Sequence, residues 1–371
     1  MPALISRDSF IGLGSVAHLA AGGEAPVLRS HVEAATRFFC DKGDGMPGRT
    51  RMFEVVARAK TRLADLLGGR SGDVALLSSA SAGLAVAAAG IEWRSGDNVV
   101  VARCEFPSVL HVWQALERRG VQVRAVGSGP VVSAGELRGA ADGRTRAIAA
   151  SHVSYLTGLR HDLGQLREIA DRVGARLVVD VSHSLGVVPV DASLCDAVVS
   201  CAYKWLLAVH GVGVFYVNSA RWPDLAPPSV GWHSVVEPHD WRARSPYVLK
   251  ADAERFEGGN PTFIGIYVLE NALAATAAIE RRAVENHVSE LGTLLRDGLT
   301  AMDLEVLTPS APAERAGNFA FASSAADEIE ARLRAEGVVV WAGDGRVRIS
   351  VHLYNDEGDV RRCLRALGPR G

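Results

Sequence analysis

Short apolar runs alternate with amphipathic helical patterns through the middle of the chain, and this alternation limits its fold more than any other feature. Runs with the length and composition of buried strands lie at residues 74–77, 98–102, 121–126, 147–153, 176–181, 197–201 and 212–217. Between two of them, Leu163, Leu166 and Ile169 share one face of a predicted helix at 163–173. Strand, helix and strand in succession predict an α/β fold, with a mostly parallel sheet sandwiched by helices. Sheets of this kind bind ligands at the carboxyl ends of their strands.

The composition and hydrophobic pattern of the sequence change after residue 220. Residues 220–255 are rich in Trp, Pro, Arg and His and predict a loop, whereas 267–287 carries a long helical pattern. Further helical patterns at 289–302 and 327–336 are separated by short apolar strands. We therefore predict a large domain at residues 15–245 and a smaller α+β domain formed by residues 1–14 and 246–371.

Composition excludes several classes of protein. The formal net charge is −2 and no polybasic run is present, which argues against a nucleic-acid partner. The five cysteines include no Cys-x-x-Cys pair, so neither a disulfide framework nor a metal site is expected. The N-terminal MPALISRDSFIGLGSV does not resemble a signal peptide, and no apolar stretch reaches the roughly 18 residues of a membrane span. We expect a cytoplasmic protein with no membrane partner.

Two polar residues follow apolar runs in a pattern that indicates cofactor chemistry. Asp180 lies near the end of the run at 176–181, and Lys204 follows the run at 197–201 between Tyr203 and Trp205. Apolar surroundings lower the pKa of a lysine, and the neutral amine forms a Schiff base with an aldehyde. A carboxylate beside a pyridine nitrogen keeps that nitrogen protonated, so that the ring withdraws electrons from the substrate. The pair predicts a pyridoxal 5'-phosphate (PLP) enzyme with its Schiff base on Lys204.

The run VVDVSHSLGVVPVDASLCDAVVSCAYKWLLAVHGVGVFYV resembles the cofactor-lysine region of the class V aminotransferase family. That family includes cysteine desulfurases, kynureninases and isopenicillin N epimerase-like enzymes, and the similarity extends from His18 to the C-terminus. At Asp180, His183 and Tyr203 the chain most resembles the kynureninase-like branch. The resemblance implies the PLP-dependent transferase type I fold, with a smaller α+β C-terminal domain. It also implies that Lys204 and Asp180 are the catalytic residues.

The resemblance further implies a set of cofactor contacts. His183 would lie near the ring hydroxyl or the phosphate. Ser79, Ala80 and Ser81 open a predicted helix, whose N-terminal N–H groups suit a phosphate. The family usually has a Gly-Thr-Thr sequence here, so the side-chain contacts differ. The remaining contacts that the resemblance implies are Phe106, Ser200, Tyr203, Trp232, Asn260 and Thr262.

Four of these positions carry particular expectations. Phe106 stands near the position where desulfurases stack a histidine on the cofactor ring, and an aromatic face can do the same; the alternative is a core phenylalanine. The loop at 255–262, with Asn260 and Thr262, resembles a family loop that reaches the phosphate of the other subunit. It implies a homodimer with shared active sites, with Trp232 contributing from the same side.

Arg348 opens an apolar strand at 347–353, where an arginine is unusual unless it is paired. The forked guanidinium matches a carboxylate in shape and charge. The resemblance implies that Arg348 binds the α-carboxylate of the substrate. The alternative is a salt bridge to an acid of the smaller domain.

The expected reaction begins with removal of the α proton of a small amino acid through a Lys204 aldimine, and we predict transamination. A carbon–sulfur or carbon–carbon lyase related to cysteine-conjugate lyases or kynureninase, and an amino-acid epimerase, stay open as alternatives. A cysteine desulfurase is disfavoured because residues 340–346 contain no cysteine. A non-catalytic binding protein of the same fold is disfavoured because both Asp180 and Lys204 are present.

Overall fold

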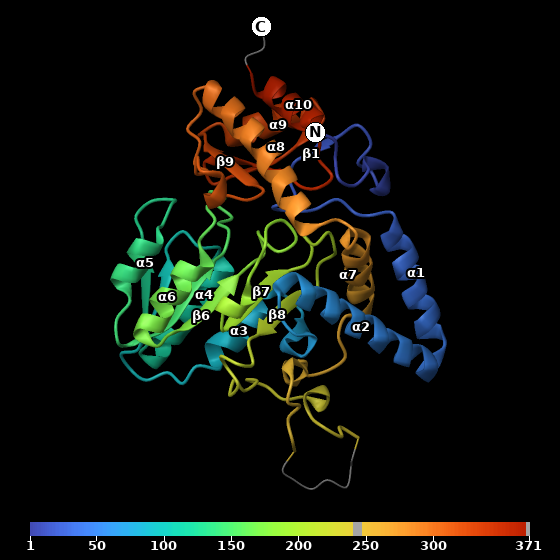
Figure 1. Ribbon diagram of the computed structural model, residues 1–371, viewed down its shortest axis with the longest axis vertical. Coiled ribbons are helices and arrows are strands. Elements are labelled where there is room, and N and C mark those ends of the chain that lie inside the picture. The colour runs from blue at the N-terminus through green and yellow to red at the C-terminus, as the bar shows by residue number, and fades with distance from the viewer. Residues whose placement is uncertain (240–246, 369–371) are drawn as a thin grey trace.

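A seven-stranded sheet forms the centre of the protein, whose computed structural model describes residues 1–239 and 247–368 (Figure 1). The strand order is β2-β8-β7-β6-β5-β3-β4. The five strands from β7 to β4 are parallel, and β8 runs antiparallel to both β7 and β2. The mostly parallel sheet is therefore confirmed. The strands are β2 (Val74–Leu77), β3 (Asn98–Ala102), β4 (Gln122–Val126), β5 (Thr145–Ser151), β6 (Arg176–Asp180), β7 (Ala197–Cys201) and β8 (Gly213–Val217).

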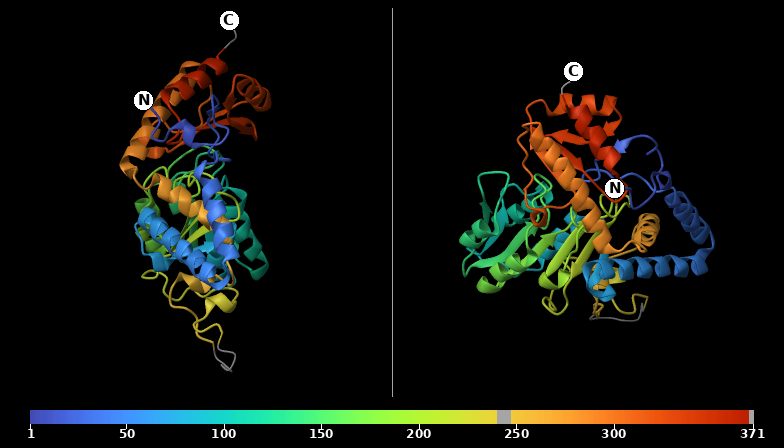
Figure 2. Two further views of the ribbon diagram at one scale, coloured as in Figure 1. Left: turned by 90° about the vertical axis from the view of Figure 1, so that its right-hand side faces the viewer. Right: turned by 45° about the horizontal axis from the view of Figure 1, so that its top comes forward.

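Helices cover both faces of this sheet because successive strand residues point to opposite sides. In β5, Ile148 packs against the helices of one face and Ala149 against those of the other. One face carries α3 (Ala80–Ala89) and α4 (Pro107–Gln114). The opposite face carries α2 (Gly45–Leu67), α5 (Ala134–Ala140), α6 (Leu163–Val173) and α7 (Phe263–Thr276), with α1 (Ser30–Gly43) packed against α2 and α7 (Figure 2).

A second hydrophobic cluster lies beyond the carboxyl ends of the parallel strands, at the top of Figure 1. It joins Phe10 and Leu28 from the N-terminal segment to Leu291 and Phe319. Its three-stranded sheet has the order β11-β12-β9, and β1 pairs with β10 beside it. The elements are β1 (Ala17–His18), α8 (Arg281–Ala301), β9 (Asn318–Ala322), α9 (Ala326–Ala335), β10 (Val338–Val339), β11 (Trp341–Gly343), β12 (Arg346–Ser350) and α10 (Glu357–Leu367).

The helical pattern predicted at 267–287 is two helices in the structure. The helices α7 and α8 meet at 84° across residues 277–280. The apolar α7 packs on the large sheet, whereas the amphipathic α8 packs in the second cluster. The single predicted helix therefore corresponds to two helices that pack in different hydrophobic clusters. The predicted boundary between residues 245 and 246 lies outside the described residues, and the division into two domains stays a prediction.

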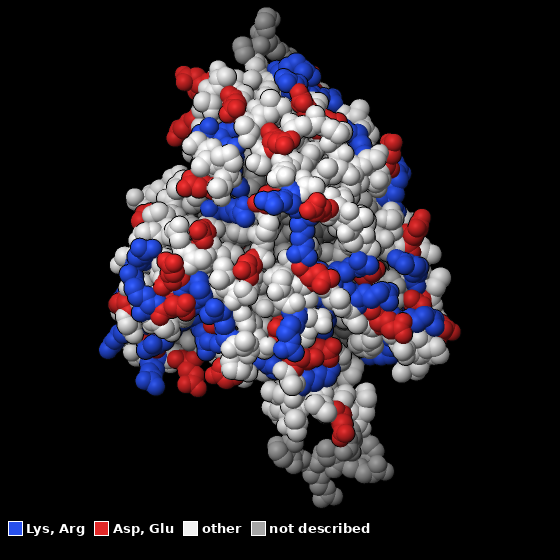
Figure 3. Space-filling model, viewed as in Figure 1, with Lys and Arg blue, Asp and Glu red and all other residues white. Residues whose placement is uncertain are grey.

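The remaining helical turns are short 3-10 segments at Arg7–Ser9, Ser71–Asp73, Ala115–Arg119, Ala192–Leu194, Trp232–Ser234, Ala253–Phe256 and Pro312–Glu314. In the part of the chain that the structure describes, no single helix has both the length and the apolar composition of a membrane span, and only the bent pair of α7 and α8 reaches them jointly. Figure 3 shows that acidic and basic side chains are mixed over the visible face. No large surface of one sign is seen there.

Candidate active site

A cavity of about 160 Å³ lies where β5, β6 and β7 end, and it brings together most of the predicted site residues. Those on its wall are Ser79, Ala80, Ser81, Phe106, Asp180, His183, Tyr203 and Lys204. They come from the loops after four different strands and from the start of α3. The carboxyl edge of a parallel sheet collects such loops, as the strand pattern predicted.

Lys204 is buried, with only 8% of its surface exposed. Its Nζ lies 3.1 Å from Nε2 of His183 and 5.4 Å from the centre of the Phe106 ring. The aromatic ring of Tyr203 lies at 5.7 Å from the same nitrogen. These contacts place the amine in a buried, aromatic environment next to a histidine nitrogen.

Asp180 is the last residue of β6, and its carboxylate faces the same cavity. Its Oδ1 accepts a hydrogen bond of 2.7 Å from the backbone N–H of Ser182. Burial raises the pKa of Asp180, while the hydrogen bonds from Ser182 and the nearby Lys204 act in the opposite direction. A buried carboxylate of this kind is stabilised by a cation, which a protonated pyridine nitrogen would supply.

The N-terminus of α3 forms another wall of the cavity. Ser79 caps the helix, because its Oγ accepts the N–H of Ala82 at 3.1 Å, and Ser81 Oγ donates to Ser108 Oγ at 2.9 Å. A Cβ on Gly213 would lie 2.2 Å from the carbonyl carbon of Ser79, so only glycine lets β8 pack this close to the turn. The free N–H groups of a helix's first turn bind phosphate. A nucleophilic lysine, a buried carboxylate and this anion-binding turn together fit PLP.

Phe106 lies at the cavity rather than in the core, since 38% of its surface is exposed. It caps α4, and its ring packs edge-on against Tyr155 with the ring centres 5.2 Å apart. Tyr155 also lines the cavity. The two rings give the site an aromatic wall beside Lys204.

Four predicted cofactor contacts do not lie on the wall of this cavity. Ser200 is buried in β7, where alternation turns its side chain away and its Oγ donates to the carbonyl of Cys201. Asn260 and Thr262 line a neighbouring hollow that shares Ser78, Gly211 and Val212 with the cavity. Within this chain, Asn260 Oδ1 accepts a hydrogen bond from Arg49, and Trp232 is 38% exposed. The roles of Asn260, Thr262 and Trp232 at the partner subunit's site stay predictions.

Arg348 lies buried on β12, next to the cavity residue Tyr155. Its Nη1 donates to the carbonyl of Tyr155 at 3.1 Å, and its guanidinium lies 4.9 Å from the Trp341 ring. Its Nε has no partner, and no described carboxylate forms an ion pair with it. Burial, helped by the neighbouring Arg346, lowers the pKa of Arg348 to about 10. The alternative of a salt bridge within the smaller sheet is therefore not seen among residues 1–239 and 247–368.

Besides Tyr155, two residues that contact the cavity wall escaped the sequence analysis. Glu105 accepts hydrogen bonds from the backbone N–H of Ser151 at 2.6 Å and from its hydroxyl at 2.5 Å, and burial raises its pKa to about 7. Asn318, on β9, places Nδ2 2.5 Å from Nδ1 of His183. A polar residue at the start of the apolar strand 318–322 was a visible signal, but its partner lies 135 residues away in the sequence.

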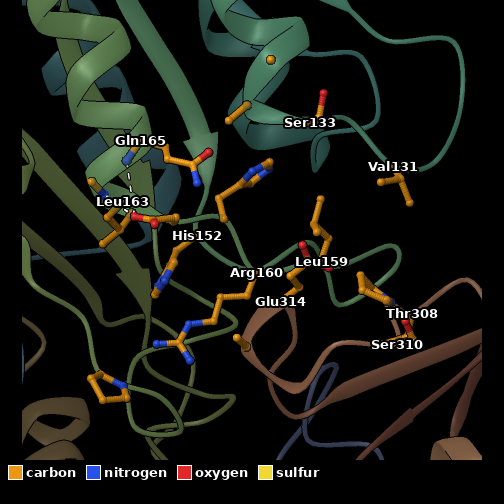
Figure 4. Close-up of a pocket in the computed structure, with 18 of the residues that line it drawn as sticks. Val131, Ser133, His152, Leu159, Arg160, Leu163, Gln165, Thr308, Ser310 and Glu314 are labelled. Carbon is orange, nitrogen blue, oxygen red and sulfur yellow. Dashed lines mark hydrogen bonds between the residues drawn. The ribbon is translucent and has the colours of Figure 1, made fainter.

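A larger hollow of about 1130 Å³ lies beside the site, between α6 and the loop before β9 (Figure 4). Arg160 reaches into it and forms an ion pair of 2.8 Å with Glu285. His152, which follows Ser151, lines the same hollow. Burial lowers the pKa of His152 to about 3, so its imidazole is neutral. None of the predicted cofactor residues lines this space.

The type I fold and a cavity that joins a buried lysine, a carboxylate and a helix N-terminus define a PLP-dependent enzyme. The chain belongs to the aminotransferase class-V family, which it matches over residues 45–365. It is 26% identical to a probable cysteine desulfurase of Methanothermobacter thermautotrophicus, over 75% of this chain and 70% of that protein. It is also 26% identical to a kynureninase of Burkholderia pseudomallei, over 77% of this chain and 71% of that protein.

Solved structures share the whole fold. The apo cysteine desulfurase from Thermococcus onnurineus NA1 superposes with a TM-score of 0.86 at 21% identity, covering 99% of this chain and 98% of that one. A mutant of C-DES with glycine linked covalently to its PLP cofactor gives a TM-score of 0.89 at 21% identity, covering 98% and 99%. The family and fold that the sequence predicted are confirmed.

Proposed function

We propose that this enzyme binds a small α-amino acid through Arg348 and catalyses its transamination, with Lys204 as the base. The observation that carries the proposal is the buried Arg348 guanidinium without a carboxylate partner among the described residues. A buried cation is costly unless it is paired, and the α-carboxylate of an amino acid would supply the missing charge. The contact between Arg348 and Tyr155 places this charge next to the cavity of Lys204.

Four parts of the cavity then have a defined task. PLP, when bound, draws electrons away from the α carbon of the substrate. Asp180 holds a proton on the ring nitrogen, and the N-terminus of α3 binds the phosphate. Phe106 covers a ring face and helps to exclude water from Lys204. Lys204 Nζ removes the α proton and can return it, and transamination needs no other base.

The cysteines do not support a persulfide-forming desulfurase. The segment between β10 and β12 places Trp341, and no thiol, beside Arg348. Burial raises the pKa of Cys104 to about 11 and that of Cys363 to about 12, so neither is a reactive thiolate. Cys201 lines the cavity, but burial raises its pKa too.

A carbon–carbon or carbon–sulfur lyase is the second candidate. The aromatic wall of Phe106 and Tyr155 favours it, because two rings at the cavity suit a substrate with a flat side chain. A relative named kynureninase aligns with most of this chain. Epimerisation would need only that the α proton return from the opposite face.

Assembly and location complete the proposal. We infer a homodimer in which the loop at 255–262 of one subunit serves the phosphate of the other, and a cytoplasmic location. Within one chain, Asn260 and Thr262 line a hollow that shares Ser78, Gly211 and Val212 with the cavity wall, so the loop lies at the edge of the site. Sedimentation of the purified protein tests the dimer. The shared site is tested by mixed dimers, in which an Asn260→Ala chain should restore activity to an inactive Lys204→Ala chain.

The reaction is tested by mixing the PLP-loaded protein with a panel of amino acids that includes kynurenine and cysteine S-conjugates. Transamination predicts that the visible absorbance bleaches and returns when a keto acid is added. Absorbance that persists while a cleaved product accumulates would establish the lyase. If no amino acid of the panel reacts, the proposal is refuted.

A further inference from the structure

Lys204 is linked by hydrogen bonds to the smaller sheet through two side chains. Its Nζ lies 3.1 Å from Nε2 of His183, and Nδ1 of His183 lies 2.5 Å from Nδ2 of Asn318. The amide oxygen of Asn318 in turn accepts from Oγ of Ser350 at 2.9 Å. At most 8% of the surface of any of these four residues is exposed. This series of hydrogen bonds therefore connects the cavity to two neighbouring strands of the other sheet, β9 and β12.

The orientation of the Asn318 amide decides which nitrogen of His183 carries the proton. An amide nitrogen can only donate, so Nδ1 of His183 must accept. A neutral imidazole that accepts at Nδ1 carries its proton on Nε2, and that N–H faces Lys204. Only an unprotonated amine can accept such a bond, since an ammonium has no lone pair.

The surroundings of Asn318 hold its amide in place. A Cβ on Gly22 would lie 2.4 Å from the amide oxygen and 2.7 Å from Ser350 Oγ. A Cβ on Gly158 would lie 2.1 Å from the backbone oxygen of Asn318. Two backbone segments thus approach as closely as glycine allows, and they leave the side chain little room to move.

The surroundings of His183 favour its neutral form. Burial lowers the pKa of His183 well below its usual value, and the cationic Arg348 acts in the same direction. The imidazole is therefore neutral, which is the condition for a single tautomer.

We propose that Asn318 is a positioning residue that fixes His183 as the Nε2–H tautomer and thereby holds the Lys204 amine in its unprotonated, nucleophilic form. This inference rests on the proposed role of Lys204 as the cofactor lysine. The amine needs its lone pair to form the C=N bond with the PLP aldehyde, with water leaving. A residue of the smaller sheet thus prepares the lysine before PLP binds.

The tautomer can be observed directly in the PLP-free protein labelled with ¹⁵N-histidine. The His183 signals are those that disappear in His183→Gln. The proposal predicts a protonated Nε2 and an unprotonated Nδ1 at neutral pH. A proton on Nδ1, or on both nitrogens, would overturn it, and this measurement needs no variant of Asn318.

A second readout is the rate at which the PLP-free protein captures PLP as a function of pH. Asn318→Asp supplies an acceptor in place of the donor, so Nδ1 becomes protonated and Nε2 accepts from a lysine ammonium. The rate profile should then move up by at least about one pH unit, which is roughly a tenfold loss of rate at neutral pH. Asn318→Leu should give a smaller shift in the same direction.

Asn218→Asp is the matched control, a buried asparagine at the far end of β8. Its profile should equal that of the unmodified protein, and an equal shift in both Asp variants would overturn the proposal. Failure of the proposed function is distinguishable, because Lys204→Ala would then still form the visible PLP adduct. If Lys204→Ala loses the adduct and Asn318→Asp leaves the profile unmoved, only the role of Asn318 is refuted.

Discussion

Replacing Arg348 by methionine should strongly weaken the use of amino-acid substrates without destabilising the PLP-free protein. The drop in the pKa of Arg348 from 12.5 to about 10 corresponds to roughly 3 kcal/mol of burial cost. The substitution removes that cost but loses the hydrogen bond to Tyr155, worth about 1.5 kcal/mol, and the contact with Trp341, worth about 1 kcal/mol. The sum predicts a change in the free energy of unfolding within about 1 kcal/mol of zero.

The catalytic effect should be much larger. A forked pair of hydrogen bonds to a carboxylate contributes about 3–6 kcal/mol, so kcat/KM for amino acids should fall by roughly 10²- to 10⁴-fold. Amines that lack the carboxylate should react equally well with both proteins. Arg315→Met, at a buried arginine bonded to Ser310 and Thr293, is the matched control and should keep kcat/KM within about threefold.

Urea denaturation of the PLP-free proteins and steady-state kinetics of the loaded ones make this test. A loss of about 3–5 kcal/mol in Arg348→Met would show that the arginine belongs to a structural ion pair. If Arg348→Met prefers amino acids over amines as strongly as the unmodified enzyme does, its role in carboxylate binding is refuted. Either result would remove the observation on which the substrate class rests.

Two further predictions concern the carboxylates of Glu257 and Glu105. Lys60 Nζ lies 2.9 Å from Glu257 Oε1, and both residues are buried. Lys60→Met should therefore lower the free energy of unfolding by roughly 3–5 kcal/mol in urea denaturation, and the double variant with Glu257→Gln should recover part of that loss. A loss under about 1 kcal/mol in Lys60→Met would contradict this prediction. The pKa of Glu105 is raised from 4.5 to about 7, so its folded state favours the protonated acid and stability falls as the pH rises from 4.5 to 7. Glu105→Gln should therefore gain up to about 3 kcal/mol relative to the unmodified protein between pH 5 and pH 8, and equal pH profiles would refute the shift.

Much of the large sheet was readable from the sequence because buried parallel strands are continuous apolar runs. The helix at 163–173 is α6 with the same bounds, since its apolar face repeats at helical spacing. The runs at 74–77 and 197–201 are β2 and β7. The site residues next to these strands followed, because each loop begins where its strand ends.

The smaller sheet and its contacts were harder to predict from the sequence. The amphipathic α10 is the last helix of the second cluster, and its pattern at 357–367 went unread. The helices α7 and α8 were merged because a bend of 84° leaves no mark in the apolar pattern. Asn318 and His183 meet only through the packing of the two sheets, which no local signal encodes.

The phosphate cradle shows the same limit on a smaller scale. The start of α3 was predicted because Ser79 is a typical N-cap residue. Ser200 was assigned by resemblance alone, and the alternation of β7 turns its side chain away from the cavity. Sequence patterns thus located the site, whereas the direction of each side chain required the packed structure.

The most direct test of the account is to load the purified protein with PLP, reduce it with borohydride and map the modified peptide by mass spectrometry. The visible absorbance should disappear on reduction, and the pyridoxyl group should be found on Lys204. Lys204→Ala should show neither the absorbance nor the label. A label on another lysine such as Lys60 or Lys250, or no visible absorbance in the unmodified protein, would contradict the central claim.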